Sequence, residues 1–328
     1  MAIYILKRVA WVIPVIIGVV AIVFTITYFT PGDPVYMVLG TEFSQEVYDA
    51  KAAEMGVDRP FIVQLGSYLF NVFTKLDFGI AFSTKVPVAE SLASRIPISV
   101  RLSLMGICLM VIIGLPLGMV QALRRYSALD IGLTSFSLLM AATPGFVLAL
   151  ICALVFGVTL KWFPITGLVG VKGHIIPVFC ISVGGIAVYA RMTRATMLEV
   201  IRQDYIRTAR AKGQKERTIV IRHALINCLI PLITILGAQI AFLFSGSVII
   251  ETIFAIPGMG TYMVTGIQSR DYPVVNGVVC VISLLVCCAN LLVDIMYAFI
   301  DPRIKAQFTS RKRIRPSRKL QNAVEVEK

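Results

Sequence analysis

The sequence is poor in charged residues and in histidine. Of its 328 residues, 15% are charged and two are histidines, His174 and His223, whereas an average soluble domain is about 25% charged. With so few histidines and no clustered carboxylates, a catalytic or metal-binding constellation is unsupported. The chain also lacks a GxxxxGK[ST] phosphate loop, so we expect it not to bind and hydrolyse ATP itself. The sequence therefore predicts neither an enzyme nor a protein with a bound cofactor or metal.

Cysteines in a metal-binding or disulfide pattern are missing as well. The seven cysteines all fall within apolar runs, and none forms a CxxC pair. Cys287 and Cys288 are adjacent, which makes them poor disulfide partners on a helix. We expect the cysteines to be small apolar packing residues, and no redox function follows from them.

Apolar residues, by contrast, are abundant. They make up 57% of the chain and the mean hydropathy is +0.84, whereas ordinary soluble domains are about 45–50% apolar. A water-soluble fold has no interior large enough to hide that excess, so the chain belongs in a bilayer. The formal net charge of +13 could indicate nucleic acid, but the cations lie in short connections between apolar runs. Their position indicates membrane topology and no nucleic-acid partner.

Several apolar runs are long enough to cross a membrane as helices, which takes about 20 residues each. We expect transmembrane helices at Val9 to Phe29, Ile96 to Val120, Ile131 to Leu160, Ile175 to Val200, Ala224 to Ile250 and Val274 to Ile300. The first run is longer than the core of a signal peptide and leads into TPGDP without a small-x-small cleavage site, so we expect it to be retained. The predicted fold class is an all-α polytopic membrane protein with six transmembrane helices.

Lysine and arginine are distributed unevenly about these helices. Most of the 31 lie on the side of the N-terminus, and such residues accumulate in cytoplasmic loops. We therefore expect both termini to face the cytoplasm. The predicted divisions are the N-terminus with the first helix (1–29), an extracytoplasmic segment (30–95), a five-helix core (96–300) and a basic tail (301–328). The tail is expected to bind anionic lipid headgroups without a specific partner.

The long segment 30–95 carries its own helical signal. SQEVYDAKAAEMG is typical of a short helix that ends at Gly56. Aromatic residues later in the segment supply some apolar anchoring, so we expect a subdomain that rests on the membrane surface. The alternative is a poorly ordered loop.

The stretch DYIRTARAKGQKERTIVIRHALINCLIP interrupts the core with a cluster of cations. Gly213 is suited to end a helix because it accepts a positive φ without a steric penalty, so we expect two helices joined at a sharp corner in a coupling loop at 201–223. Tyr205 and Ala209, four residues apart, would share a docking face for another protein. The alternative is a solvated loop that only sets orientation. The candidate coupling residues are Asp204, Tyr205, Arg207, Thr208, Ala209, Arg210, Lys212, Gly213, Arg222 and His223.

YIRTARAKG…RHALINCLIP resembles the cytoplasmic EAA loop of ABC importer permeases, in the form found in the dipeptide, oligopeptide and nickel permease family. The Glu-Ala-Ala core of that motif falls on Arg207, Thr208 and Ala209, its glycine on Gly213 and its proline on Pro231. Arginine replaces the glutamate, and the interval from glycine to proline is longer than in sugar permeases. Both departures are similar to the peptide and nickel branch. TPGDPV, ETIFAIPGMG and NLLVDIMYAFIDPRI resemble the B-type subunit of that branch.

The resemblance implies partners and a location. Such permeases work in the cell inner membrane with a second, similar permease subunit, two cytoplasmic ABC ATPase subunits and an extracytoplasmic substrate-binding protein. The expected cargo is a di- or oligopeptide, including glutathione-like peptides. A nickel or other metal chelate is the alternative within the family.

Ionisable groups and prolines at membrane depth are candidates for the gate or pathway. Asp294, inside the sixth run, either contacts a polar group on a neighbouring helix or reaches water near the interface. Glu251 and Pro257 lie where the fifth run ends, and could form an outer gate or only stabilise a turn. Pro144 and Pro231 each remove a helical hydrogen bond. Each could kink its helix at a gate, or serve only in helix packing.

Two other classes of function remain open. A secondary transporter driven by an ion gradient would need inverted repeats, broken helices near the midplane and more buried ionisable groups than Asp294 alone. A membrane scaffold or receptor that recruits a cytoplasmic partner through the basic loop is not excluded by any local feature.

Overall fold

The computed structural model describes residues 2–40 and 42–300. Within these residues the protein is helical, and β geometry is limited to an isolated bridge between Ile80 and Pro87. The predicted all-α polytopic class is confirmed. The basic tail predicted at 301–328 lies outside the described residues.

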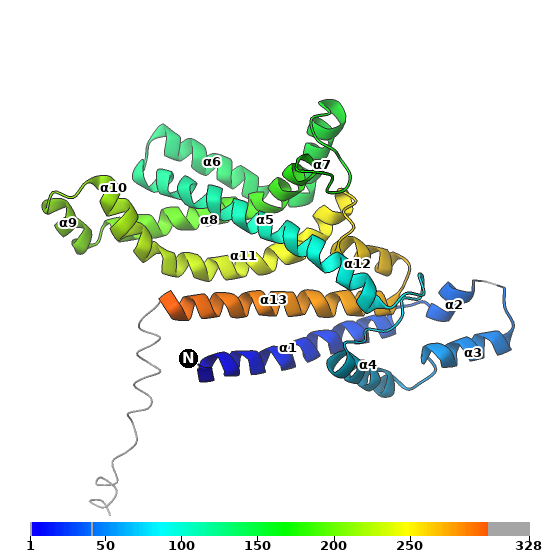
Figure 1. Cartoon of the computed structure of the whole chain (residues 1–328). Coiled ribbons are helices and arrows are strands. Elements are labelled where there is room, and N and C mark those ends of the chain that lie inside the picture. Colours follow the sequence, from blue (N-terminus) through cyan, green and yellow to red (C-terminus); the bar gives the residue numbers. More distant parts are fainter. Residues whose placement is uncertain (1, 41, 301–328) are drawn as a thin grey trace, which may run out of the picture.

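Among the described residues, five helices are long and apolar enough to cross a membrane (Figure 1). They are α1 (Ala2–Phe29), α5 (Val88–Leu123), α8 (Lys172–Ile201), α11 (Ile226–Ile253) and α13 (Tyr272–Ile300). Four of them contain a predicted run whole, and α11 contains the fifth run from Ile226 onward. The second helix begins eight residues earlier than expected, so the end of segment 30–95 belongs to α5.

The third predicted run is not one straight helix. It divides into α6 (Ala128–Ala142) and α7 (Gly145–Cys152), which continues as the π-helical turn η1 (Ala153–Thr159), and the two parts are bent by 99°. Proline has no N–H for the helix ladder, and it forces the preceding residue out of the helical region. Thr143 is accordingly extended, at φ −81° and ψ 122°, and Pro144 is the N-cap of α7. Pro144 therefore breaks the run, and the predicted number of six spans holds only if the two bent parts together form one span.

Segment 30–95 contains three short helices before α5 begins. They are α2 (Pro34–Leu39), α3 (Gln45–Met55) and α4 (Phe61–Lys75). The predicted end at Gly56 is confirmed, because this residue caps α3 in the left-handed region at φ 70°. Asp33 caps α2 by accepting a hydrogen bond from the Val35 N–H.

The core is centred on α5, α8 and α11, with α1 and α13 packed together beside them (Figure 1). Helix α5 approaches α8 closely through two glycines four residues apart. A Cβ atom on Gly118 would overlap the Ala190 carbonyl oxygen, and one on Gly114 would press on Tyr189. Small residues with this spacing let helices pack backbone to backbone in a membrane, where lipid provides no hydrophobic drive.

The helices place two sets of short elements at opposite ends of the bundle (Figure 1). At one end lie α9 (Asp204–Ala211), α10 (Glu216–Thr218) and the π-helical turn η2 (Ile219–Leu225), together with the start of α1 and the end of α13. We call residues 201–223 the elbow and this end the elbow end. The opposite end, called the far end, carries α2, α3, α4 and α12 (Met259–Gln268).

Candidate functional site: the elbow and the buried carboxylates

The elbow is a helix, a glycine corner and a second helix, as the sequence predicts. Gly213 has φ +76°, and its N–H donates to the Arg210 carbonyl oxygen over 2.9 Å. The Gln214 N–H donates to the Ala209 carbonyl oxygen over 3.3 Å, so the last carbonyls of α9 are satisfied. The chain then turns back through α10 and η2 into α11. Most residues with a Cβ atom would be strained at this corner, and asparagine and aspartate would be strained least.

One face of α9 packs on the chain itself. Ile206 and Ala209 are 0% and 7% exposed, and they belong to a core cluster with Met197, Ile219 and Val220. We expected Ala209 to share the outward face with Tyr205, and that placement was wrong. Ile206 is the apolar residue that decides which face turns inward, and Ala209 lies three residues on, over the same face.

The outward face of α9 is polar and solvated. Tyr205 is 45% exposed, and Arg207 and Thr208 are exposed beside it. The exposed Arg210 spans the corner to pair with Glu216, with its Nε 2.7 Å from the Glu216 carboxylate, and this hydrogen bond raises the pKa of Arg210. The remaining polar candidates, Asp204, Lys212, Arg222 and His223, are at least partly exposed. The structure thus leaves a continuous face on which a partner can dock.

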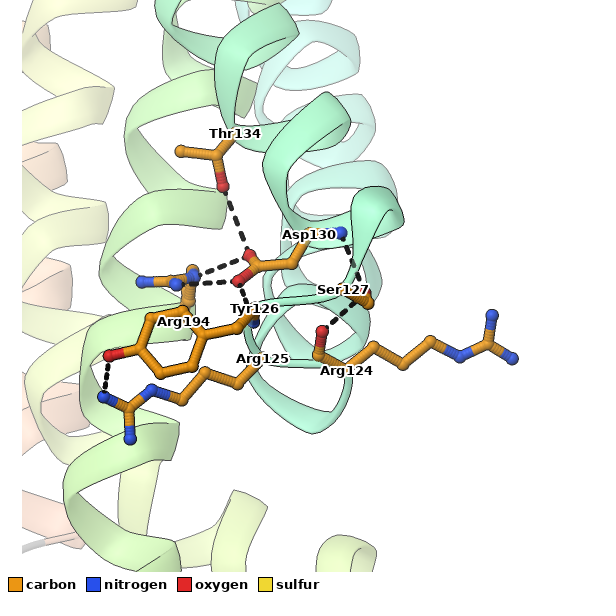
Figure 2. Close-up of polar contacts among 7 residues, drawn as sticks. All are labelled: Arg124, Arg125, Tyr126, Ser127, Asp130, Thr134 and Arg194. Carbon is orange, nitrogen blue, oxygen red and sulfur yellow. Dashed lines mark hydrogen bonds and ion pairs between the residues drawn. The ribbon is translucent and has the colours of Figure 1, made fainter.

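A buried ion pair that the sequence analysis missed lies between α6 and α8 (Figure 2). Asp130 is 2% exposed, and Arg194 binds it with two hydrogen bonds of 2.9 Å from Nε and 2.8 Å from Nη2. The Tyr126 N–H and the Thr134 hydroxyl also donate to the carboxylate, over 3.0 and 3.3 Å. Both carboxylate oxygens are therefore satisfied, which is the condition under which a buried pair is tolerated.

The same turn holds the start of α6 in place. Ser127 is the N-cap of α6, with its Oγ accepting the Asp130 N–H over 3.2 Å. Beside it, the Arg125 guanidinium lies over the Tyr126 ring, 4.2 Å from the centroid, and contacts its hydroxyl (Figure 2). Asp130 and Arg194 stand at the edges of two predicted runs. Opposite charges placed in apolar helices should pair, and that signal could have found them.

At the far end, Glu251 fixes the turn between α11 and α12. It is 0% exposed, and its Oε2 accepts the Gly260 N–H over 2.7 Å. The Ser99 hydroxyl of α5 accepts the N–H of the preceding residue, Met259, over 2.8 Å. A Cβ atom on Gly258 would overlap both acceptors, so only glycine allows this approach. The other carboxylate oxygen of Glu251, Oε1, has no hydrogen-bond partner in the described part of the chain.

A second buried carboxylate at the far end is similar. Asp271 is 0% exposed, and its Oδ2 accepts the backbone N–H and the hydroxyl of Ser83 over 2.8 and 2.7 Å. Its Oδ1 has no partner among the described residues. Asp271 ties the start of α13 to the loop before α5.

The five gate candidates do not form one site. Glu251 and the exposed Pro257 share the turn at the far end, whereas Pro144 breaks the third run and Pro231 lies inside an unbroken α11. Asp294 lies toward the elbow end, with its Oδ2 2.6 Å from Nη1 of Arg8 on α1. Both side chains are partly exposed, at 29% and 49%. Asp294 therefore has a charged partner on a neighbouring helix and also reaches the surface.

Comparison with known proteins decides the family. A family model described as "Binding-protein-dependent transport system inner membrane component" matches residues 114–306, and the model of its N-terminal region matches residues 1–103. The chain belongs to this permease family. The resemblance carried by the elbow motif is thus confirmed.

Relatives of this permease match over nearly the whole length of both chains. A peptide transport system permease protein of Brucella abortus is 40% identical over 309 residues, covering 92% of this chain and 98% of the relative. The oligopeptide transport system permease protein of Bacillus subtilis is 37% identical, covering 93% and 100%. The glutathione transport system permease protein of Escherichia coli K12 is 34% identical, covering 92% and 98%.

Solved structures share the fold of the permease core. Chains of the MetNI methionine ABC transporter, in inward-facing conformations, match 64% of this chain and 96% of their own length. Their TM-scores are 0.56 and 0.57, at 20% and 18% sequence identity. This likeness concerns the fold alone.

Proposed function

We propose that the chain is one of two permease subunits of an ATP-driven importer and forms half of a translocation pathway for di- or oligopeptides. Family membership supports the transport role, and the names of the relatives, which state peptide, oligopeptide and glutathione transport, support the cargo. The observation that carries the mechanism is the elbow, whose α9 packs on its own chain with one face and presents the other to solvent. The remaining subunits would be a second permease, two ATPases and an extracytoplasmic binding protein.

In the proposed topology the chain spans the cell inner membrane with its elbow end on the cytoplasmic side. The elbow gathers cations, and Lys and Arg accumulate on the cytoplasmic side. The start of α1 and the end of α13 lie at the same end (Figure 1), so both chain ends would be cytoplasmic. The far end, with segment 30–95, would face the binding protein.

In the proposed mechanism, closure of the ATPases on ATP moves α9 as a rigid body. The movement passes into α8, which is separated from α9 by two residues. From α8 the Arg194 side chain transmits it to α6 through Asp130, and the close contact at Gly118 transmits it to α5. At the far end the turn held by Glu251 would rearrange. In this mechanism separate subunits hydrolyse ATP, which agrees with the absence of a phosphate loop from this sequence.

Reconstitution separates this proposal from an ion-driven transporter. Proteoliposomes that contain both permeases and both ATPases should take up tri-alanine presented by the binding protein, and uptake should require ATP. Liposomes with this chain alone should take up none under a proton or sodium gradient. Gradient-driven uptake without the ATPases would contradict the proposal, and transport of a nickel–histidine chelate in place of tri-alanine would assign the cargo to the nickel branch.

Docking at the elbow can be tested with one exposed residue. Thr208→Trp enlarges the outward face of α9 without entering the core, so we expect co-purification with the ATPase subunits to fall strongly. Thr74→Trp, at an exposed position of α4, is the matched control and should retain them. Ala209→Trp would be a poor test, because Ala209 is buried in its own chain. Full retention of the ATPases by Thr208→Trp would exclude this face as the docking site.

A further inference from the structure

A cavity at the far end belongs neither to the elbow nor to the turn at Glu251. Its volume is about 710 Å³, and it is open to the exterior. The end of α1, the start of α2, part of α3, the first half of α4, the loop before α5 and the start of α13 surround it, and Figure 1 shows these elements together at that end. Cavities of about 300–1,000 Å³ are the usual size for small-molecule sites.

The floor of the cavity has polar groups with unused hydrogen-bonding capacity. The Tyr68 hydroxyl is buried and has no hydrogen-bond partner among the described residues. Asn276 on α13 is 4% exposed, and its side-chain amide hydrogen-bonds to Thr27 of α1 over 3.4 Å. Buried polar groups are normally hydrogen-bonded, and leaving one unpaired is unfavourable. One unpartnered hydroxyl, that of Tyr68, and the long Asn276–Thr27 hydrogen bond line the same cavity. They indicate a ligand with hydrogen-bonding groups of its own.

The rim of the cavity carries both signs of charge. Arg59 and Lys85 are exposed cations, and neither forms an ion pair within the part of the chain that the structure describes. Asp77 accepts the Gly79 N–H over 2.8 Å, and Asp33 accepts from the Val35 N–H and the Tyr48 hydroxyl. The bond to Asp33 raises the pKa of Tyr48 to about 12. Asp33 forms no ion pair with another described residue.

Aromatic side chains form much of the wall between floor and rim. The cavity lining includes Tyr28, Phe78, Phe82 and Tyr272. Aromatic rings offer large apolar contact area at a low cost in side-chain entropy, so they accept apolar groups of different shapes.

We infer that this cavity is a cargo site that binds a short zwitterionic peptide of about two to four residues, a ligand of the size such cavities hold. The floor amide and hydroxyls would pair with peptide amides, the rim cations with the terminal carboxylate and the rim carboxylates with the terminal ammonium. A lipid chain would instead require an apolar floor. The identity of the cargo as a peptide rests on the proposed function. The cavity adds a location, outside the core of the helix bundle, at which this subunit binds the peptide.

The experiment measures binding of radiolabelled tri-alanine to the purified complex of both permeases and both ATPases in lipid nanodiscs. Tyr68→Phe removes only a hydroxyl that has no partner among the described residues, so the fold is preserved. We expect it to weaken binding about threefold to tenfold, the equivalent of one net hydrogen bond. Tyr262→Phe is the matched control. Its hydroxyl is also buried without a partner in the described chain, but it lies outside this cavity and should leave binding unchanged.

Charge changes at the rim give an independent readout. Arg59→Glu and Lys85→Glu should weaken binding of tri-alanine about tenfold and have little effect on tri-alanine amide, which lacks the terminal carboxylate. Equal affinities of wild type, Tyr68→Phe and Arg59→Glu would overturn the inference. So would a phospholipid that native mass spectrometry finds on the wild type and not on these variants, with no effect on peptide binding.

Failure of the cavity and failure of the proposed function are distinguishable. If ATP-dependent tri-alanine uptake proceeds while the cavity variants bind and transport as wild type, the cavity is not a cargo site and the proposed function stands. If the cavity variants lose binding but the complete complex never transports tri-alanine, the cavity is a peptide site and the importer proposal is wrong.

Discussion

The two ends of the bundle bury carboxylates in different ways. Asp130, at the elbow end, is 2% exposed and has a bidentate cation, a backbone N–H and a hydroxyl around its two oxygens. Glu251 and Asp271, at the far end, are both 0% exposed. Each binds a neighbouring turn or loop through one oxygen, and the other oxygen has no partner in the described chain.

This difference separates a fixed region from one with room to rearrange. A fully satisfied polar network rigidifies its surroundings, whereas a partly satisfied one leaves hydrogen-bonding capacity for a second arrangement. The elbow end therefore suits a part that transmits force without deforming. The far end suits a part that changes its contacts during a transport cycle. Substitutions that equalise the two ends test this reading.

The largest expected effect is at the buried pair. Asp130→Asn keeps the shape of the side chain and leaves the Arg194 cation without its partner, and breaking a buried pair destabilises by about 3–5 kcal/mol. We expect a loss near the lower figure, because the Arg194 side chain is 27% exposed. Thermal unfolding of the purified chain in detergent, followed by circular dichroism, measures it.

A double variant supplies the control for that pair. Asp130→Leu with Arg194→Met removes both charges and should recover most of the loss, since apolar replacement of a buried pair is often neutral or stabilising. A wild-type unfolding temperature for Asp130→Asn alone would show that the pair does not fix α6 to α8.

The equivalent change at the far end should be milder. Glu251→Gln can still accept the Gly260 N–H, and it alters an oxygen that has no partner within residues 2–40 and 42–300, so we expect a change within about 1 kcal/mol. Glu251→Ala also releases the Gly260 N–H and should destabilise by about 1–3 kcal/mol. The same unfolding assay compares them. A loss for Glu251→Gln as large as that for Asp130→Asn would remove the contrast between the two ends.

The smallest effects belong to the exposed ion pairs of the elbow end. Arg210 and Glu216 are 42% and 62% exposed, and Asp294 with Arg8 is also solvated. Exposed pairs contribute about 0–1 kcal/mol and weaken in salt. Glu216→Gln and Asp294→Asn should therefore lower stability by less than about 1 kcal/mol, and less again in 1 M NaCl. A loss above about 2 kcal/mol would show that these pairs are structural.

Features set by neighbouring residues could be predicted from the sequence. The apolar runs predict the long helices, and Gly56 and Gly213 end helices at positive φ where a glycine was expected to do so. The elbow corner follows from the same local rule. Each of these depends on a few consecutive residues and on backbone sterics.

Features set by distant contacts could not be predicted in the same way. The inward turn of Ala209 depends on a surface that α8 and η2 provide, and Asp130 meets an arginine 64 residues away. The break at Pro144 has a local cause, but the apolar run continues on both sides of it and is long enough for one span. Proline alone does not predict a break, because α11 continues unbroken through Pro231. The cavity needs α1, α4 and α13 to assemble first, so no single stretch of sequence carries it.

The central claim is that movement of the ATPases is transmitted to this chain through the elbow. Its corner requires a residue that can adopt a positive φ at position 213. The direct test is ATP-driven tri-alanine uptake by the complete reconstituted transporter carrying Gly213→Asn or Gly213→Pro, with subunit assembly checked by co-purification. Asparagine tolerates positive φ, whereas proline requires φ near −65° and lacks the N–H that Gly213 donates to Arg210. We predict that the asparagine variant transports near the wild-type rate and that the proline variant assembles, hydrolyses ATP and transports almost nothing. Wild-type uptake by the assembled proline variant would contradict the claim.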